Sequence, residues 1–147
     1  MTIMGRIPIF PMPHCIKENQ MIRKIIHTRS APEPIGPYSQ AVVCGNMVYT
    51  SGQIAIDPET GELITGDVDA QAMRVLENLK AVLGAAGSSL DSVIRTTIYL
   101  KNMGDFPRVN EIYAGYFGKS MPARSTVEVS RLPKDVLIEI DCIGVIG

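Results

Sequence analysis

Two charged side chains in the C-terminal part of the chain have types and positions suited to chemistry on an anion. Arg124 follows Met121-Pro-Ala at the start of a β-branched run, and Glu139 lies inside the apolar run 137–140. An arginine fork matches a carboxylate in two parallel hydrogen bonds. A glutamate in a pocket can pass protons near neutral pH, because burial raises the pKa of a carboxyl group. One hypothesis is therefore that Arg124 binds an anion and Glu139 transfers a proton beside it.

Each of these residues also has a plain structural alternative that the residues alone leave open. Arg124 is equally an arginine on the surface that pairs with an acid, and Glu139 a solvated carboxylate at a sheet edge. Tyr38 lies in a loop with three prolines, where its hydroxyl either donates to a ligand or its ring covers the core.

Three further positions are candidates, and two other charged residues are not. Ser51 and Gly52 end an apolar run, where backbone N–H groups are expected to point at an oxyanion. Ser51 has no general base paired with it in the sequence, which argues against a nucleophile. Asn110 lies on an expected helix, whereas Arg95 and Lys101 are expected to be solvated charges at strand edges.

The sequence gives little support to a metal site, a Ser-His-Asp catalytic triad or disulfide bonds. The only histidines are His14 and His27, and no ligand spacing is present, so no metal is expected. Three separated cysteines, Cys15, Cys44 and Cys142, fit reduced thiols that act as small apolar fillers in a cytoplasmic protein. A net charge of -1 argues against a nucleic-acid partner, because such proteins usually have a basic face.

The first twenty residues differ from the rest of the chain. Residues 1–20 contain three prolines and neither a continuous apolar stretch nor a clear cleavage site, so they predict neither a signal peptide nor a folded element. We expect an extension outside the fold, followed by a single domain over residues 21–147. No apolar run is long enough to span a membrane.

The domain predicts six strands and two helices in the order βββ-α-β-α-ββ. Gly45-Asn46 joins two apolar runs, and both residues tolerate positive φ, which favours a hairpin. Apolar residues recur with helical period after Asp67 or Asp69 as cap, up to Gly87 as stop. The expected strands are 22–28, 40–44, 47–51, 92–101, 123–130 and 136–145, and the expected helices are 67–87 and 105–118.

This order predicts an α+β fold, a mixed sheet with both helices packed on one face. The strand at 92–101 carries apolar residues at both parities, which indicates that the second face of the sheet is also buried. Since the helices cover only one face, we expect an oligomer.

Four segments resemble the RidA/YjgF family, also known as liver perchloric-acid-soluble protein. The resemblance runs in order from about Met21 to Val145, and its most specific part is the long segment around Arg124. The segments are Ile35-Gly-Pro-Tyr-Ser-Gln40, Tyr49-Thr-Ser-Gly-Gln53, Asn110-Glu-Ile-Tyr113 with Phe117, and Pro122-Ala-Arg-Ser-Thr-Val-Glu-Val-Ser-Arg-Leu-Pro-Lys-Asp135 leading to Ile138-Glu-Ile140.

The resemblance implies a chorismate-mutase-like fold, a barrel-like homotrimer with clefts between subunits, and no cofactor. The implied reaction is hydrolysis of 2-aminoacrylate, 2-aminocrotonate and their imine tautomers to 2-keto acids and ammonia. The implied catalytic residues are Arg124, which holds the carboxylate, Glu139, which activates water, and Tyr38, which fixes the imine. The residues implied to bind substrate beside Arg124 are Ser51, Gly52, Asn110 and Thr126.

One departure limits what can be carried over. Many family members have cysteine where this chain has Thr126, so a thiol nucleophile is not expected here, although the Thr126 backbone N–H remains a donor. The family is also described as an endoribonuclease that inhibits translation. That activity, and non-catalytic binding of keto acids or a chaperone role, stay as alternatives.

Overall fold

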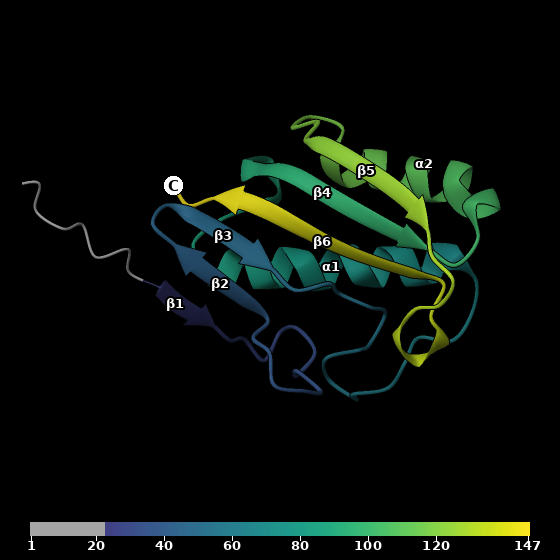
Figure 1. The fold of residues 1–147 in the computed structure, drawn as a ribbon, viewed down its shortest axis with the longest axis horizontal. Helices are drawn as coiled ribbons and strands as arrows, with labels where there is room; N and C mark the ends of the chain where they lie inside the picture. Colours follow the sequence, from purple (N-terminus) through teal and green to yellow (C-terminus); the bar gives the residue numbers. More distant parts are fainter. Residues whose placement is uncertain (1–22) are drawn as a thin grey trace, which may run out of the picture.

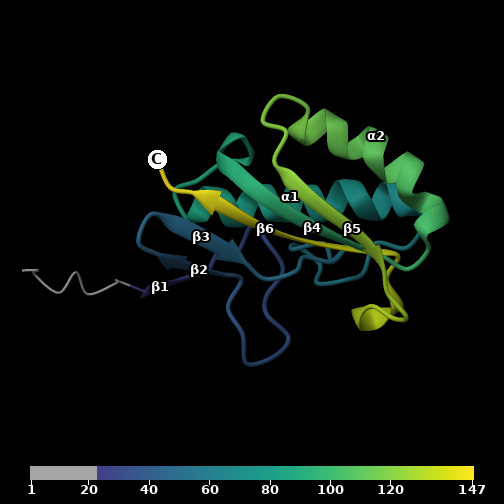
Figure 2. The same cartoon turned by 45° about the horizontal axis from the view of Figure 1, so that its top comes forward.

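The computed structural model describes residues 23–147, and both the expected extension 1–20 and the expected strand start at position 22 lie outside them. The elements follow the predicted order: β1 Arg23–Ile26, β2 Ala41–Cys44, β3 Met47–Thr50, α1 Val68–Ala85, β4 Val93–Leu100, α2 Phe106–Phe117, β5 Ala123–Glu128 and β6 Ile138–Val145. The six strands form one mixed sheet in the order β1-β2-β3-β6-β4-β5, in which only β4 and β5 run parallel. Both helices lie on one face of this sheet (Figure 1 and Figure 2), so the predicted α+β architecture is confirmed.

The local signals at turns and caps explain where these elements begin and end. Cys44 and Met47 pair across the predicted Gly45-Asn46 turn, where Gly45 has the only positive φ of the two, 61°. The Asp67 side chain accepts a hydrogen bond from the Ala70 N–H and caps α1. The helix ends before Gly87, whose φ is 79°.

Each predicted strand extends past the observed one, and the largest differences are two residues, at the end of β1, at the start of β6 and at the end of β5, which stops at Glu128 instead of residue 130. The first was expected to reach residue 28 but ends at Ile26, because the Gln40 side chain bonds both the N–H and the carbonyl of Thr28. The last begins at Ile138, because a turn of 3₁₀ helix, Pro133–Asp135, precedes it with positive φ at Lys134 and Asp135.

The two faces of the sheet differ in what covers them. Along β6, Ile138, Ile140 and Cys142 are buried under the helices, whereas the side chains between them are only half-buried. The helix-free face carries exposed apolar side chains, including Ile25, Tyr49 and Val127. Within residues 23–147 no helix is long and apolar enough to cross a membrane.

Candidate functional site

Arg124 lies in a cavity of about 440 Å³ between α2 and the edge strand β5. Its guanidinium carbon is 4.7 Å from the centre of the Tyr113 ring and 5.4 Å from that of Phe106, and one Nη donates to Asn110 Oδ1 at 2.9 Å. All three contacts come from α2, so a helix and a strand together orient the guanidinium. We call this cavity the arginine pocket; it is lined by Tyr113, Ala114, Phe117, Gly118, Met121, Pro122 and Arg124.

The guanidinium of Arg124 makes no ion pair with a carboxylate of the described residues. Across residues 23–147, the side chains that pair with carboxylates are those of His27, Lys80, Lys101 and Arg108, and Arg124 is not among them. The alternative that Arg124 pairs with a surface acid is therefore wrong for the described chain. A neutral amide and two aromatic rings orient the fork and leave its charge available to an anion from outside.

Asn110 and Thr126 both lie on the arginine side of the sheet. Asn110 contacts Arg124 directly, a contact that the resemblance, which implied only a place near the site, did not specify. Thr126 pairs with Ile98 in β4, on the same face as Arg124, which pairs with Thr96. The Thr126 hydroxyl oxygen is buried and has no hydrogen-bond partner among the described residues. Such an orphaned hydroxyl at this position is a polar group that a ligand could satisfy.

Glu139 lines a different cavity, of about 330 Å³. Burial, and to a lesser degree the charge of Asp141, raise the pKa of the Glu139 carboxyl. The alternative of a fully solvated edge carboxylate is therefore wrong, because Glu139 is half-buried and faces a cavity. We call this cavity the glutamate pocket; it is lined by Ile35, Tyr38, Ser51, Gly52, Ile54, Pro133 and Glu139.

Gly52 fixes where the Glu139 carboxylate lies. A Cβ added at Gly52 would be 1.9 Å from Glu139 Oε1 and 2.7 Å from its Cδ. Real Cβ atoms do not approach other atoms this closely, so any other residue at this position must displace the carboxylate. Gly52 is therefore a packing surface for Glu139, in addition to its expected role near the substrate.

Ser51 does not have the role expected of its backbone. Its N–H donates to the Gln40 carbonyl at 2.9 Å, and its hydroxyl donates to the Ser39 carbonyl at 2.6 Å. Both donors thus tie the end of β3 to the segment before β2, and the prediction that the Ser51 N–H points at an oxyanion is wrong. Ser51 still lines the glutamate pocket, where substrate binding by this residue stays a prediction.

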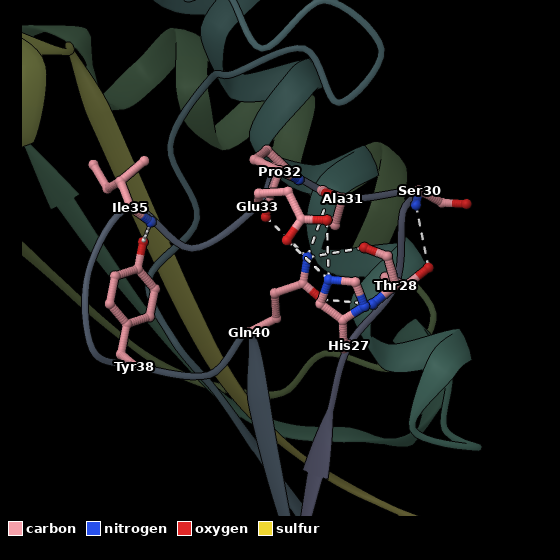
Figure 3. Close-up of polar contacts among 9 residues, drawn as sticks. All are labelled: His27, Thr28, Ser30, Ala31, Pro32, Glu33, Ile35, Tyr38 and Gln40. Carbon is pink, nitrogen blue, oxygen red and sulfur yellow. Dashed lines mark hydrogen bonds and ion pairs between the residues drawn. The ribbon is translucent and has the colours of Figure 1, made fainter.

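Tyr38 lines the glutamate pocket from the loop between β1 and β2. The residue is 49% exposed, so the alternative that its ring covers the core is wrong. Its hydroxyl accepts a long hydrogen bond, 3.4 Å, from the Ile35 N–H, which bends the loop back on itself (Figure 3).

Buried side-chain amides hold the loops around the glutamate pocket. Gln40 donates to the carbonyls of Thr28, Ala31 and Pro32 and accepts from the Thr28 N–H (Figure 3). Asn78 of α1 is completely buried and donates to the carbonyls of Ile54 and Ile56. No sequence signal pointed to Asn78, since an asparagine in an amphipathic helix is usually a surface residue.

Gln71 of α1 forms hydrogen bonds with two more irregular segments, the one before β6 and the one before α1. It accepts from the Leu137 N–H at 2.8 Å and donates to the Ile64 carbonyl at 3.1 Å. The backbone groups of these irregular segments have few partners in regular secondary structure. The side-chain amides of Gln71 and Asn78 supply hydrogen bonds to them instead.

The arginine pocket and the glutamate pocket lie on opposite faces of the sheet. Arg124 shares the face of its partner Thr96, whose buried hydroxyl bonds Tyr113 of α2 at 2.7 Å. Glu139 pairs with Tyr99, and both residues point to the helix-free face, where the loop between β1 and β2 also extends (Figure 2). The expected site residues are therefore two groups in one chain: Arg124, Asn110 and Thr126 on one side, and Tyr38, Ser51, Gly52 and Glu139 on the other.

Metal-ligating and reactive groups are sparse in the described part of the chain. Residues 23–147 contain no cluster of three or more histidine, cysteine or acidic side chains suited to a metal. Cys142 is buried, and burial raises the pKa of its thiol to about 12, so it stays an unreactive thiol. Cys44 is half-buried on β2.

Comparisons with known proteins agree with this fold. The family model described as Endoribonuclease L-PSP matches residues 28–146. A RutC family protein of Pyrococcus horikoshii is 60% identical over 123 residues, which is 84% of this chain and 98% of the relative. The solved structure of Escherichia coli TdcF with bound serine matches with a TM-score of 0.80 and 47% identity, covering 84% of this chain and 99% of that chain.

A second solved structure, the YjgF gene product of Escherichia coli, matches with a TM-score of 0.79 and 50% identity over 83% of this chain and 98% of that chain. The fold and these likenesses define a small α+β protein of the L-PSP type. The chain belongs to the RutC/YjgF family, the family that its sequence motifs resemble.

Proposed function

We propose that this protein hydrolyses small 2-imino acids, formed from enamines such as 2-aminoacrylate and 2-aminocrotonate, to 2-keto acids and ammonia. The observation that carries the proposal is Arg124, whose guanidinium is oriented by α2 and has no carboxylate partner within residues 23–147. A fork oriented in this way suits the carboxylate of such a substrate. The TdcF structure with bound serine adds support, because serine also carries an α-carboxylate.

Glu139 is the proposed proton carrier. It directs a water molecule at the imine carbon; as the C–O bond forms, the C=N π electrons move to nitrogen and the water proton passes to Glu139. The proton then moves on to nitrogen, which gives a carbinolamine. Glu139 next takes the proton of its hydroxyl group and passes it to the NH2 group; as the C=O bond forms, the C–N bond breaks and ammonia leaves with the C–N electron pair. A raised pKa of the Glu139 carboxyl suits this exchange near neutral pH.

Tyr38 and Asn110 have supporting roles in this proposal. Tyr38 donates to the imine nitrogen from the rim of the glutamate pocket, and Asn110 keeps the Arg124 fork in place. The buried Thr126 hydroxyl and the backbone at Gly52 complete the contacts to substrate. The imine is already electrophilic, so the reaction needs no cofactor, and positioning with proton transfer suffices.

The proposal requires more than one copy of the chain. Arg124 and Glu139 cannot meet at one small substrate within a single chain, because a sheet separates them. We propose a barrel-like homotrimer in which the arginine pocket of one copy faces the glutamate pocket of the next. The exposed apolar side chains of the helix-free face, such as Tyr49 and Val127, would be covered in this assembly.

The direct test measures the release of keto acid and ammonia while a dehydratase supplies the enamine, in a buffer near neutral pH. Arg124→Lys keeps the charge and loses the fork; losing one charge-assisted bond of about 1.5–3 kcal/mol lowers turnover about 10- to 150-fold. Arg29→Lys, in an exposed loop, is the matched control and keeps wild-type turnover. Equal turnover in the two variants would remove Arg124 from the site.

The family model's name makes RNA cleavage the second candidate. A salt-titrated cleavage assay on single-stranded RNA separates the two activities. RNA cleavage that is lost in Arg124→Lys, in a protein that releases no keto acid, replaces the proposed reaction. Binding of keto acids without any turnover would instead support a non-catalytic binder.

A further inference from the structure

A second cavity adjoins Glu139, and Tyr38 does not line it. It has a volume of about 260 Å³, and Tyr99, Arg131 and Asp141 line it together with Glu139. Glu139 and Pro133 line both this cavity and the glutamate pocket, so Glu139 has one group of neighbours in each. The polar residues of this second cavity, Tyr99, Arg131 and Asp141, have no role in the proposed reaction as described so far.

Asp141 is the acidic neighbour of Glu139 within this cavity. The two residues are two positions apart on β6 and therefore point to the same face of the sheet. Tyr99 of β4 pairs directly with Glu139, and its hydroxyl reaches along the sheet to donate to Asp141 Oδ2 at 2.9 Å. This bond holds the Asp141 carboxylate on the Glu139 side of the sheet.

The other polar groups around Glu139 come from three segments. Tyr99 faces it from β4, Arg131 shares the second cavity from the segment after β5, and Tyr38 shares the glutamate pocket from the loop before β2. Of these, the phenol of Tyr99 has a pKa raised by burial and by its bond to Asp141, so it remains a neutral donor. Asp141 is thus the acidic side chain nearest to Glu139 along its own strand.

We propose that Asp141, fixed by the Tyr99 hydroxyl, is a positioning residue that makes Glu139 a stronger base for the attacking water. This inference rests on the proposed function, because it concerns the proton that Glu139 takes up. A like charge on the same face disfavours ionisation of a carboxyl group, so the Asp141 charge, in addition to burial, favours the protonated form of Glu139. Asp141 acts through Glu139 and does not contact the substrate.

The experiment compares two variants that separate charge from hydrogen bonding. Asp141→Asn keeps the shape and removes the charge, whereas Tyr99→Phe keeps the charge and removes the bond. The Glu139 carboxyl is titrated directly by carbon NMR in full-length protein labelled at glutamate side chains, with Glu139→Gln to assign its signal. Asp91→Asn, at an exposed position before β4, is the control for loss of one carboxylate.

In Asp141→Asn the Glu139 titration moves to lower pH, and the acidic limb of kcat/KM for imine hydrolysis moves with it. The plateau of kcat also falls, because a weaker base removes the water proton less readily. Tyr99→Phe shifts the titration less than Asp141→Asn does, and Asp91→Asn does not shift it.

Three results overturn the inference. They are an unchanged Glu139 titration in Asp141→Asn, an equal shift in Tyr99→Phe, or a shifted titration with an unmoved acidic limb. If even the wild type hydrolyses no imine, the proposed function fails, while the titration still tests the coupling of the two carboxylates on its own.

Discussion

The arginine pocket and the glutamate pocket are built in different ways. Arg124 stands at the start of a strand and is oriented by side chains of one helix, α2. Glu139 is on a strand too, but its surroundings are loops that buried amides such as Gln40 and Asn78 hold in place. Anion binding by Arg124 depends on the orientation of one guanidinium, which a helix and a strand provide. Proton transfer by Glu139 depends on how several irregular segments together place its carboxylate. The glutamate pocket should therefore be the more sensitive of the two to small changes.

The largest expected effect comes from Gly52→Ala. The new Cβ overlaps the Glu139 carboxylate and displaces it, so the proton-transfer contribution, about 10²–10⁴ in rate, is lost from kcat. The arginine pocket is untouched, so KM should change much less. Steady-state kinetics on dehydratase-generated imine measure both quantities.

Gly84→Ala is the matched control for this change. Gly84 lies in α1 with no atom within 4 Å of its added Cβ, so alanine there should keep activity and stabilise the helix by about 0.5–1 kcal/mol. A Gly52→Ala enzyme as active as Gly84→Ala would mean that the position of Glu139 does not matter.

The next largest effect is on stability, from Asn78→Ala. The change removes two hydrogen bonds. The Ile54 carbonyl keeps the Ile56 N–H as a donor, whereas the Ile56 carbonyl loses its donor, which costs about 1–3 kcal/mol. Urea denaturation measures the free energy of unfolding, with Asn46→Ala in the exposed hairpin turn as control. If both variants lose the same stability, the amide does not hold the loop.

A smaller effect is expected on the pH dependence of stability, from Glu139→Gln. Because burial raises the pKa of Glu139 above its ordinary value of 4.5, the folded state binds its proton more tightly than the unfolded state. Wild-type stability therefore falls as pH rises from 4.5 through the folded-state pKa. The variant escapes this loss, so it should melt at a higher temperature than wild type near neutral pH and show no such advantage below pH 4.5. Thermal melts across this range decide the sign, and a glutamine variant that is less stable at neutral pH contradicts it.

Much of the fold and half of the site could be predicted from the sequence. The order of elements, the Asp67 cap and the hairpin at Gly45 depend on local signals that a few neighbouring residues carry. That Asn110 lies near Arg124 was expected only through the family resemblance, and their hydrogen bond is known only from the structure.

The separation of Arg124 from Glu139 could not be predicted in the same way. It depends on β6 inserting between β3 and β4 and on the parallel register of β5, which are pairings between distant segments. The buried amides were also missed, because Gln71 and Asn78 have no periodic signal that distinguishes a buried amide from a surface one. The error on Ser51 has the same origin, since its partner Gln40 is known only once the loop is placed.

Mixing of two inactive variants tests most directly whether the site is assembled from two copies. Arg124→Lys retains the glutamate pocket and Glu139→Gln retains the arginine pocket, so copies of the two facing each other restore one intact site. Random co-assembly of equal amounts after unfolding and refolding should recover about a quarter of wild-type imine hydrolysis, because each interface draws its two sides independently. Activity no greater than the sum of the separate variants would contradict a site shared between copies.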